Sequence, residues 1–388
     1  MADDDDDEPK PRLRPNTPGL WPGPIPERLQ PWLDKAQANL AAPYRGIVSE
    51  GRIEEEFFTL ASTGVSLQPL IDAAAAFLDS LGVEHRSQAS FPPDSDVWRG
   101  WNNMHLFVMR HGVCLEHLGQ RQRELALNLL RVSVSDSAFA TARDVMRLNE
   151  HLREITGRTD EFGEWFYWIA VIGTPSPTEP WGWQIDGHHL TVSAFVCGDQ
   201  FVMTPSFMGS EPVHARSGKY AGTRVFAAEE LEGLAVMQAL TSEQQARATI
   251  GMQIPADVFA GATFDNLDLP YEGMPYPAMS AASQALLLQL IELYVGRVRR
   301  GHAAIQLAQV KRHLDRTWFA WIGHHDDTSV FYYRVHSPVI LIEFDHQAGV
   351  ALVNPTPTRG HIHTMVRTPN GNDFGQALRR QSLKRSPG

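Results

Sequence analysis

The stretch Trp181-Gly182-Trp183-Gln184-Ile185-Asp186-Gly187-His188-His189-Leu190 opens the β-rich part of this chain. It places two tryptophans and a Gly-His-His triplet in front of an apolar run, residues 191–196. A second histidine pair, His361 and His363, opens a similar run near the C-terminus. Short runs rich in branched and aromatic residues favour buried strands. We therefore expect these two distant segments to meet and to hold a metal ion.

The chain before this stretch has a helical pattern. Apolar residues recur every three or four positions in 66–82, 120–133 and 137–155, as in amphipathic helices. The pattern then changes, and residues 165–172 and 183–196 favour strands. Gly198-Asp199 favours a hairpin turn into a further strand at 200–204.

The C-terminal half predicts both helices and strands, separated by the long loops 205–226 and 255–277. The expected helices are two short ones within 227–250 and longer ones at 279–298 and 302–314. The expected strands are 317–322, 329–336, 339–344, 350–353 and 361–367. The sequence shows no internal repeat. The predicted fold class is α+β: a helical N-terminal half is followed by antiparallel β-hairpins and helices, which form a sheet system around one pocket.

Three regions are expected from composition. Residues 1–8 contain six acidic residues and residues 9–31 contain eight prolines, a composition that favours a disordered arm over 1–31. Residues 32–376 are expected to form a single α+β domain. Residues 377–388 are expected to be a flexible basic tail with Arg379, Arg380, Lys384 and Arg385.

The bulk composition excludes several classes of protein. The chain has 388 residues, 43% hydrophobic, and a net charge of -11 without a basic stripe, so we expect no nucleic-acid partner. Two cysteines provide no disulfide framework, the acidic start is unlike a signal peptide, and no apolar stretch is long enough to span a bilayer. We therefore expect a cytoplasmic protein with no membrane partner. A homo-oligomer is compatible with the sequence.

Four histidines are the candidate metal ligands. His361 and His363 are two residues apart, which on a strand places both imidazoles on one face. His188 and His189 are adjacent, so on a strand only one of them would face the same metal, and the other would orient a ligand. The competing interpretation is that these residues are ordinary polar groups on a strand surface or in the core.

Glu343 is the candidate base or fourth ligand. It stands in the otherwise apolar run 339–344, and a buried carboxylate without a partner is costly. Arg334 and His336, on the preceding hairpin arm, are candidate partners and candidate substrate contacts. A purely structural pair of Glu343 with Arg334 remains an alternative.

The segment after the second histidine pair offers further candidates. Arg367 has even spacing from His361 and His363, so on a strand it shares their face and would bind an anionic group of a substrate. Asp373 is a candidate base or supporting acceptor. Trp181 and Trp183 would form the wall of the pocket. The alternative for the segment 367–375 is a turn that caps the sheet.

The assembled motifs resemble the DUF3500 family, bacterial and fungal proteins known as a domain of unknown function. The residues that carry the resemblance are the 181–190 stretch, Pro205-Ser206-Phe207-Met208-Gly209, Glu211-Pro212, Tyr332-Tyr333-Arg334-Val335-His336, Ile342-Glu343, and 361–375. The resemblance covers about residues 60–376 as one domain. It implies no activity.

The functional hypothesis therefore depends on the residues themselves. No GxSxG, Walker loop or GxGxxG after a strand is present, which leaves serine hydrolase, P-loop and Rossmann functions without support. Histidines with a carboxylate suit zinc, iron, copper or manganese. We expect a mononuclear metal-dependent enzyme acting on a small anionic or aromatic molecule, by hydrolysis through a metal-activated water in preference to oxidoreduction. The alternatives are a metal-free protein that binds a small ligand, and a structural or partner-binding protein.

Overall fold

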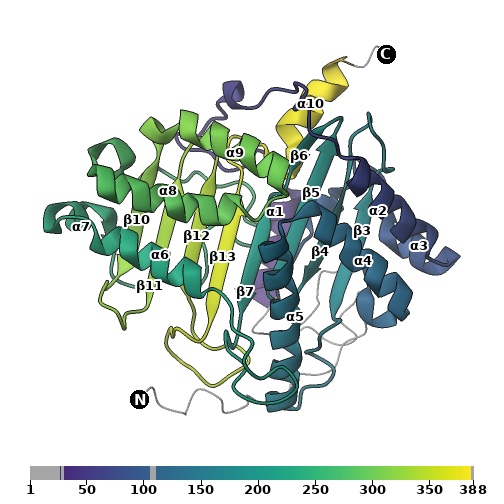
Figure 1. Ribbon diagram of the computed structural model, residues 1–388, viewed down its shortest axis with the longest axis horizontal. Helices are drawn as coiled ribbons and strands as arrows, with labels where there is room; N and C mark the ends of the chain where they lie inside the picture. Colours follow the sequence, from purple (N-terminus) through teal and green to yellow (C-terminus); the bar gives the residue numbers. More distant parts are fainter. Residues whose placement is uncertain (1–26, 28–29, 105–110, 386–388) are drawn as a thin grey trace.

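A single mixed sheet of 13 strands runs through the centre of the molecule (Figure 1). The computed structural model describes residue 27 and residues 30–104 and 111–385. The main strand order is β1-β3-β4-β5-β7-β13-β12-β11-β10-β8, with β2 on β3, β6 on β5 and β9 on β10. The strands are β1 (Ser90–Phe91), β2 (Val113–Cys114), β3 (Tyr167–Ile172), β4 (Trp181–Gly187), β5 (Leu190–Cys197), β6 (Gln200–Val202), β7 (Ser206–Ser210), β8 (Thr249–Gly251), β9 (Met274–Pro275), β10 (Trp318–Gly323), β11 (Phe331–His336), β12 (Leu341–His346) and β13 (Ile362–Arg367).

The two β-rich regions join in the middle of this sheet. β7 pairs antiparallel with β13, so that Ser206 lies opposite Val366 and Ser210 opposite Ile362. The expected α+β class and the expected joining of the two regions are therefore confirmed. The central strands β4, β5, β7, β12 and β13 are buried along their whole length, so the charged and polar residues of β12 and β13 are buried too.

Helices cover one face of the sheet. In Figure 1, α2, α4, α5, α6, α8 and α9 lie in front of the strands. No helix of the described residues is long and apolar enough to cross a membrane. The helices are α1 (Gln30–Ala41), α2 (Gln68–Asp79), α3 (Val83–Ala89), α4 (Gln120–Ser133), α5 (Asp136–Thr156), α6 (Ala227–Gln238), α7 (Ser242–Ala248), α8 (Ala281–Val295), α9 (Arg300–Arg312) and α10 (Gln376–Arg385).

Irregular chain covers part of the opposite face. The segment 252–273 packs there, and Ala260 and Leu269 form a small apolar cluster with Ile47 and Leu341. Glu343 of β12 accepts hydrogen bonds from backbone N–H groups of the same segment. A loop has many backbone N–H and C=O groups without partners in secondary structure. Polar side chains on the strand face beneath it can therefore hydrogen-bond to the loop backbone.

The fold contains a topological duplication that the sequence does not reveal. The elements α2-α3-β1-β2-α4-α5-β3-β4-β5-β7 recur in the same order as α6-α7-β8-β9-α8-α9-β10-β11-β12-β13. β1 pairs parallel with β3 and β2 antiparallel, as β8 and β9 do with β10. The α4–α5 and α8–α9 linkers also pair reciprocally, through Ser135 N–H to Arg297 O (3.0 Å) and Arg299 N–H to Ser133 O (3.2 Å). The two halves thus face each other across β7 and β13.

Most of the predicted elements are present. The helices expected at 66–82, 120–133 and 137–155 are α2, α4 and α5, and those expected after residue 227 are α6 to α9. Residues 376–385, mostly expected as a flexible tail, form α10. The arm predicted over 1–31 lies outside the described residues, except for 27, 30 and 31.

Three local predictions are wrong. Residues 183–196 are not one strand but parts of β4 and β5, with His188 and His189 as the turn between them. The loop expected at 205–226 contains the central strand β7, which has a small polar residue at each end. The segment 350–353 does not join the sheet. Burial on both faces removes the alternation that would have marked these boundaries.

Gly233 tests the packing of α6 on the sheet. A Cβ at this position would lie 2.1 Å from Cε1 of Tyr333. Although alanine usually stabilises a helix interior relative to glycine, we expect Gly233→Ala to lower the free energy of unfolding by about 1–3 kcal/mol. The exposed Leu231 of the same helix provides the control, since Leu231→Ala should change stability by about 0.5 kcal/mol or less. Equal urea midpoints for both variants would contradict this packing.

Candidate metal centre

Three histidines from two distant segments converge at one end of the central strands. His189 comes from the β4–β5 turn, His361 precedes β13, and His363 lies within β13. Their Nε2 atoms are 3.0 Å apart for 189–361, 3.1 Å for 189–363 and 3.0 Å for 361–363. All three side chains are buried, and the three residues form a group with the spacing of metal ligands.

The β4–β5 turn brings only one histidine of its pair into this group. His189 has a left-handed backbone, with φ 62°, and its ring stacks on that of His188 with centroids 4.0 Å apart. His188 instead bonds through Nδ1 to Oδ1 of Asn149 in α5, at 2.8 Å. The pair was expected on a strand but forms a turn, and only one of its two rings lies in the group.

Gly209 makes room for the rings. It lies opposite His363 in the β7–β13 pair, and its N–H donates to the backbone oxygen of His189 at 2.8 Å. A Cβ here would lie 2.9 Å from Cδ2 of His363 and 3.1 Å from Cδ2 of His189. A side chain at this position would therefore push the imidazoles apart.

Hydrogen bonds behind two of the rings fix their protonation. Nδ1 of His361 lies 2.8 Å from the backbone oxygen of Ala348, and Nδ1 of His363 lies 2.9 Å from Oδ1 of Asp257. Both oxygens accept, so each Nδ1 carries a proton, and in a neutral ring Nε2 then presents a lone pair. Burial lowers the pKa of His361 to about 4, which keeps that ring neutral near pH 7.

With these rings neutral, the three converging Nε2 atoms carry too few protons to hydrogen-bond to one another. Nε2 of His361 and of His363 are both acceptors and lie 3.0 Å apart, so neither donates to the other. A proton on Nε2 of His189 would be shared between these two acceptors. The lone pairs of His361 and His363 would still face each other. A cation at the centre of the three nitrogens would satisfy all three, as neutral imidazole ligands do in metal sites.

Carboxylates surround the outer side of the cluster. Oε2 of Glu211 lies 3.9 Å and Oδ1 of Asp345 lies 4.0 Å from Nδ1 of His361 and His363 respectively. Burial, and then the charges of Asp257 and Glu343, raise the pKa of Asp345 well above its usual range. Among the described residues, no lysine or arginine forms an ion pair with Glu211, Asp257 or Asp345. The carboxylates of Glu211 and Asp257 would attract a cation, and a bound cation would in turn favour the ionised form of Asp345.

Glu343 holds the segment 252–273, the covering segment, against the sheet. The carboxylate accepts from the N–H groups of Phe259 (2.8 Å) and Ala260 (2.9 Å) and from the hydroxyl of Tyr332 (2.8 Å). Its partners are therefore not those predicted, since Arg334 pairs instead with Glu272 at 2.7 Å. Burial raises the pKa of Glu343.

Arg367 holds the same segment from β13. Its guanidinium donates to Asp373 (2.7 Å), Asp265 (2.8 Å) and the backbone oxygen of Ala260 (2.8 Å). These anions raise its pKa despite burial. Asp373 also accepts from the N–H of Thr368 at 2.7 Å. Arg367 and Asp373 thus form a buried structural network and, together with Glu343, anchor the segment that presents Asp257 to His363.

The remaining predicted substrate contacts lie elsewhere. Trp181 and Trp183 are buried in the hydrophobic core on β4 and form no wall around the histidines. His336 is buried against the ring of Tyr271, 4.6 Å between centroids, and burial lowers its pKa to about 3. The prediction for these residues used their closeness in sequence to the candidate ligands and base, which does not give their distance from the site.

Four residues of the site were not predicted: Gly209, Glu211, Asp257 and Asp345. Asp345 alternates with Glu343 in an apolar strand, so the argument applied to Glu343 would have found it. Asp257 stands in a loop and carries no sequence signal.

Comparison with known proteins identifies one family. The family model described as "Protein of unknown function (DUF3500)" matches residues 63–376. No curated protein and no solved structure matches the chain.

Arg367→Met tests the structural role of the buried network. The substitution leaves Asp265 and Asp373 without their shared cation, and we expect a loss of about 3–5 kcal/mol in the free energy of unfolding. The control is Arg316→Met, which breaks a partly exposed pair with Glu54 and should cost about 1 kcal/mol or less. Chemical denaturation of both variants measures the difference. Unchanged stability of Arg367→Met would restore the predicted role in substrate binding.

Proposed function

We propose that this chain, which belongs to the DUF3500 family of proteins of unknown function, is a mononuclear metal-dependent enzyme acting on a small molecule. The observation that carries the proposal is the convergence of three imidazole nitrogens, two of which have their protons fixed on the far side of the ring. Such an arrangement is unfavourable without a cation and is the donor set of many metal sites.

The spacing of the donors supports a single divalent transition metal. Ligands that are 3.0 Å apart and about 2.1 Å from a common ion subtend angles near 90° at it. Three neutral imidazoles leave the ion's charge uncompensated, and the carboxylates of Glu211, Asp257 and Asp345 lie where they would offset it. Zinc, iron, copper and manganese all accept this donor set.

Hydrolysis is the first candidate reaction. A divalent ion bound by three protein ligands keeps positions open, lowers the pKa of a bound water and polarises a carbonyl or phosphoryl oxygen. The residues of this chain would hold the ion and fix its ligands: Ala348 and Asp257 orient two rings, and Gly209 lets them approach. Glu343 would act through the covering segment and not as a base or fourth ligand.

Oxidoreduction is the second candidate, favoured by one observation. Angles near 90° are those of three donors on one face of an octahedron, whereas tetrahedral zinc prefers wider ones. Such a face leaves room for more than one further ligand, as redox enzymes with iron require. The identity of the bound metal therefore separates the two candidates.

The proposal no longer includes an anionic or aromatic substrate. That expectation depended on Arg367 as an anchor and on the two tryptophans as a wall. Arg367 is fully buried between two carboxylates, and Trp181 and Trp183 belong to the core.

Metal analysis tests the proposal directly. For protein purified without a histidine tag, we expect about one transition-metal ion per chain, and below about a tenth after His189→Ala, His361→Ala or His363→Ala. The control is His324→Ala in an exposed loop, which should retain the metal. Circular dichroism checks that each variant folds. A wild-type chain that neither contains nor takes up metal would exclude the enzyme proposed here and favour the metal-free binding protein.

Asp257 tests the geometry behind the rings. Asp257→Asn keeps the shape of the side chain but removes the charge that holds the Nδ1 proton of His363. We expect metal affinity to fall about 10–100-fold, with little change in the stability of the metal-free protein because the side chain is 50% exposed. Competition with a chromophoric chelator measures the affinity. Asp94→Asn, at an exposed loop position, is the control, and equal affinities in the two variants would contradict the assignment.

A further inference from the structure

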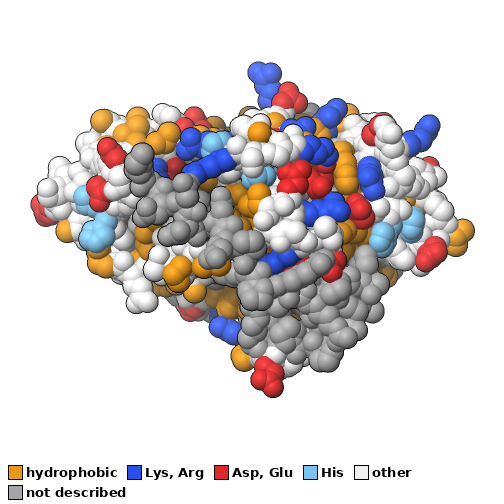
Figure 2. Space-filling model, turned by 90° about the horizontal axis from the view of Figure 1, so that it is seen from below, with side chains coloured by type: hydrophobic (Ala, Val, Ile, Leu, Met, Phe, Trp, Pro, Cys, Tyr) orange, Lys and Arg blue, Asp and Glu red, His pale blue; other side chains and the backbone are white. Residues whose placement is uncertain are grey.

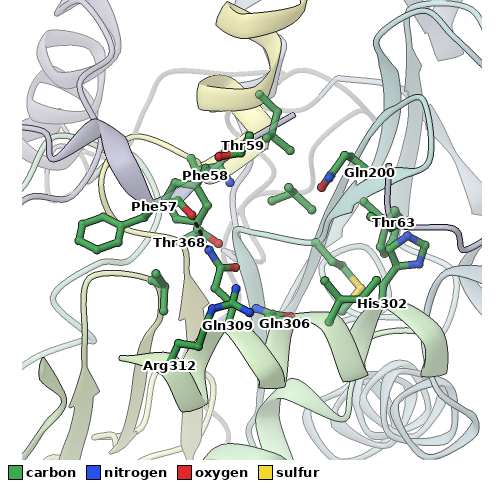
Figure 3. A pocket seen from close by; sticks show the side chains of 17 residues that line it. Phe57, Phe58, Thr59, Thr63, Gln200, His302, Gln306, Gln309, Arg312 and Thr368 are labelled. Carbon is green, nitrogen blue, oxygen red and sulfur yellow. Dashed lines mark hydrogen bonds between the residues drawn. The ribbon is translucent and has the colours of Figure 1, made fainter. Parts of the chain in front are cut away.

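A cavity lies at the opposite end of β13 from the histidines. Its volume is about 230 Å³, and Figure 3 shows side chains from α9, β6 and the segment 57–63 pointing into it. Thr368 and Asn372, which follow β13, also line it. His361 and His363 stand at the start of the same strand, so roughly 17 Å of chain separates the two places.

One face of α9 supplies a polar wall. His302, Gln306 and Gln309 recur at intervals of four and three residues, and all point into the cavity in Figure 3. Gln306 has no hydrogen-bond partner among the described residues. Phe57, Phe58, Phe201 and Met203 supply apolar surface around these groups.

Some of the donors around the cavity are already engaged. Nε2 of Gln309 donates to the backbone oxygen of Phe57 at 2.7 Å, and Nε2 of Gln200 donates to that of Ala61. Nε2 of His302 donates to the backbone oxygen of Asp199 at 2.8 Å. Each of these amides keeps a second N–H and its side-chain oxygen, and Gln306 keeps its whole amide, so the cavity offers both donors and acceptors, with Nδ1 of His302 as a further acceptor.

Two acceptors of the lining also lack a donor. Nδ1 of His302 and Oδ1 of Asn372 are buried without a partner among the described residues. Burial lowers the pKa of His302, so its ring is neutral and Nδ1 accepts. Buried acceptors without a donor are costly, and a ligand that donates hydrogen bonds would offset this cost.

The charge of the lining restricts the ligand. Among the described residues that line the cavity there is no carboxylate, which disfavours a cation, and Arg312 at the exposed edge carries the only fixed charge. The other polar groups of the lining are neutral, which favours a neutral ligand over an anion. The volume is below the roughly 300–1,000 Å³ of sites for drug-sized ligands, so the ligand is small.

We propose that this cavity is a second ligand site, for a small neutral polyhydroxylated molecule such as a monosaccharide or cyclic polyol. Hydroxyl groups donate to the glutamine oxygens and to Nδ1 of His302 and accept from the free amide N–H groups, and the C–H face packs on the phenylalanines. This site is independent of the metal centre: it shares no residue with the histidine cluster and needs no metal.

Saturation-transfer NMR on the full chain tests the proposal, with glucose, ribose and myo-inositol as neutral probes and benzoate as an anionic one. We expect transfer to at least one neutral probe and none to benzoate. Ile305→Trp fills the mouth from a position that is 38% exposed, and Gln306→Leu removes a free amide, so each should weaken binding at least about tenfold.

Two matched variants control for unspecific effects. Leu231→Trp adds an indole to an exposed position of α6, and Gln88→Leu removes an exposed amide from α3. Both should bind like the wild type. Absence of transfer to all three neutral probes, equal losses in test and control variants, or binding of benzoate alone would overturn the proposal.

Discussion

The pairing of β7 with β13 is the interaction on which the rest of the structure depends. Each of these strands is the last strand of one of the two duplicated halves. Their antiparallel pairing joins the two halves into one sheet. The register places Gly209 opposite His363, and the β4–β5 turn adds His189 from the adjacent strand pair. A shift of one residue in this register would turn His363 to the helix-covered face and disperse the cluster.

The two faces of the sheet perform different tasks. The helical face is apolar and aromatic, as Tyr333 against Gly233 shows. The other face carries Glu343 and Arg367, whose charges are satisfied by loop backbone and by other charged side chains beneath irregular chain. Buried ion networks are a poor source of stability but hold parts in place. Here they hold the segment that brings Asp257 behind a candidate metal ligand. Figure 2 shows the underside of the molecule, where acidic and basic side chains lie close together over part of the described surface.

The predicted fold was largely right, for identifiable reasons. Amphipathic spacing located α2, α4 and α5, because each helix buries only one side. It failed at β4–β5 and at β7, because strands buried on both faces lack alternation and because the turn uses His189 with a left-handed backbone, where glycine or asparagine would have been the signal. The duplication was invisible because similar topology does not require similar residues.

The sequence by itself determined that two β-rich segments carry histidines at a spacing that suits one metal site, and that His361 and His363 share a strand face. Only the tertiary structure decided that His189 and not His188 joins them, since a turn orients adjacent side chains differently from a strand. It also decided that Glu343, Arg367 and Asp373 hold the segment 252–273 in place and do not reach the histidine cluster. Contacts between strand and loop depend on how the chain folds over the sheet. Spacing along the chain specifies a face, whereas distance from a site is set by packing.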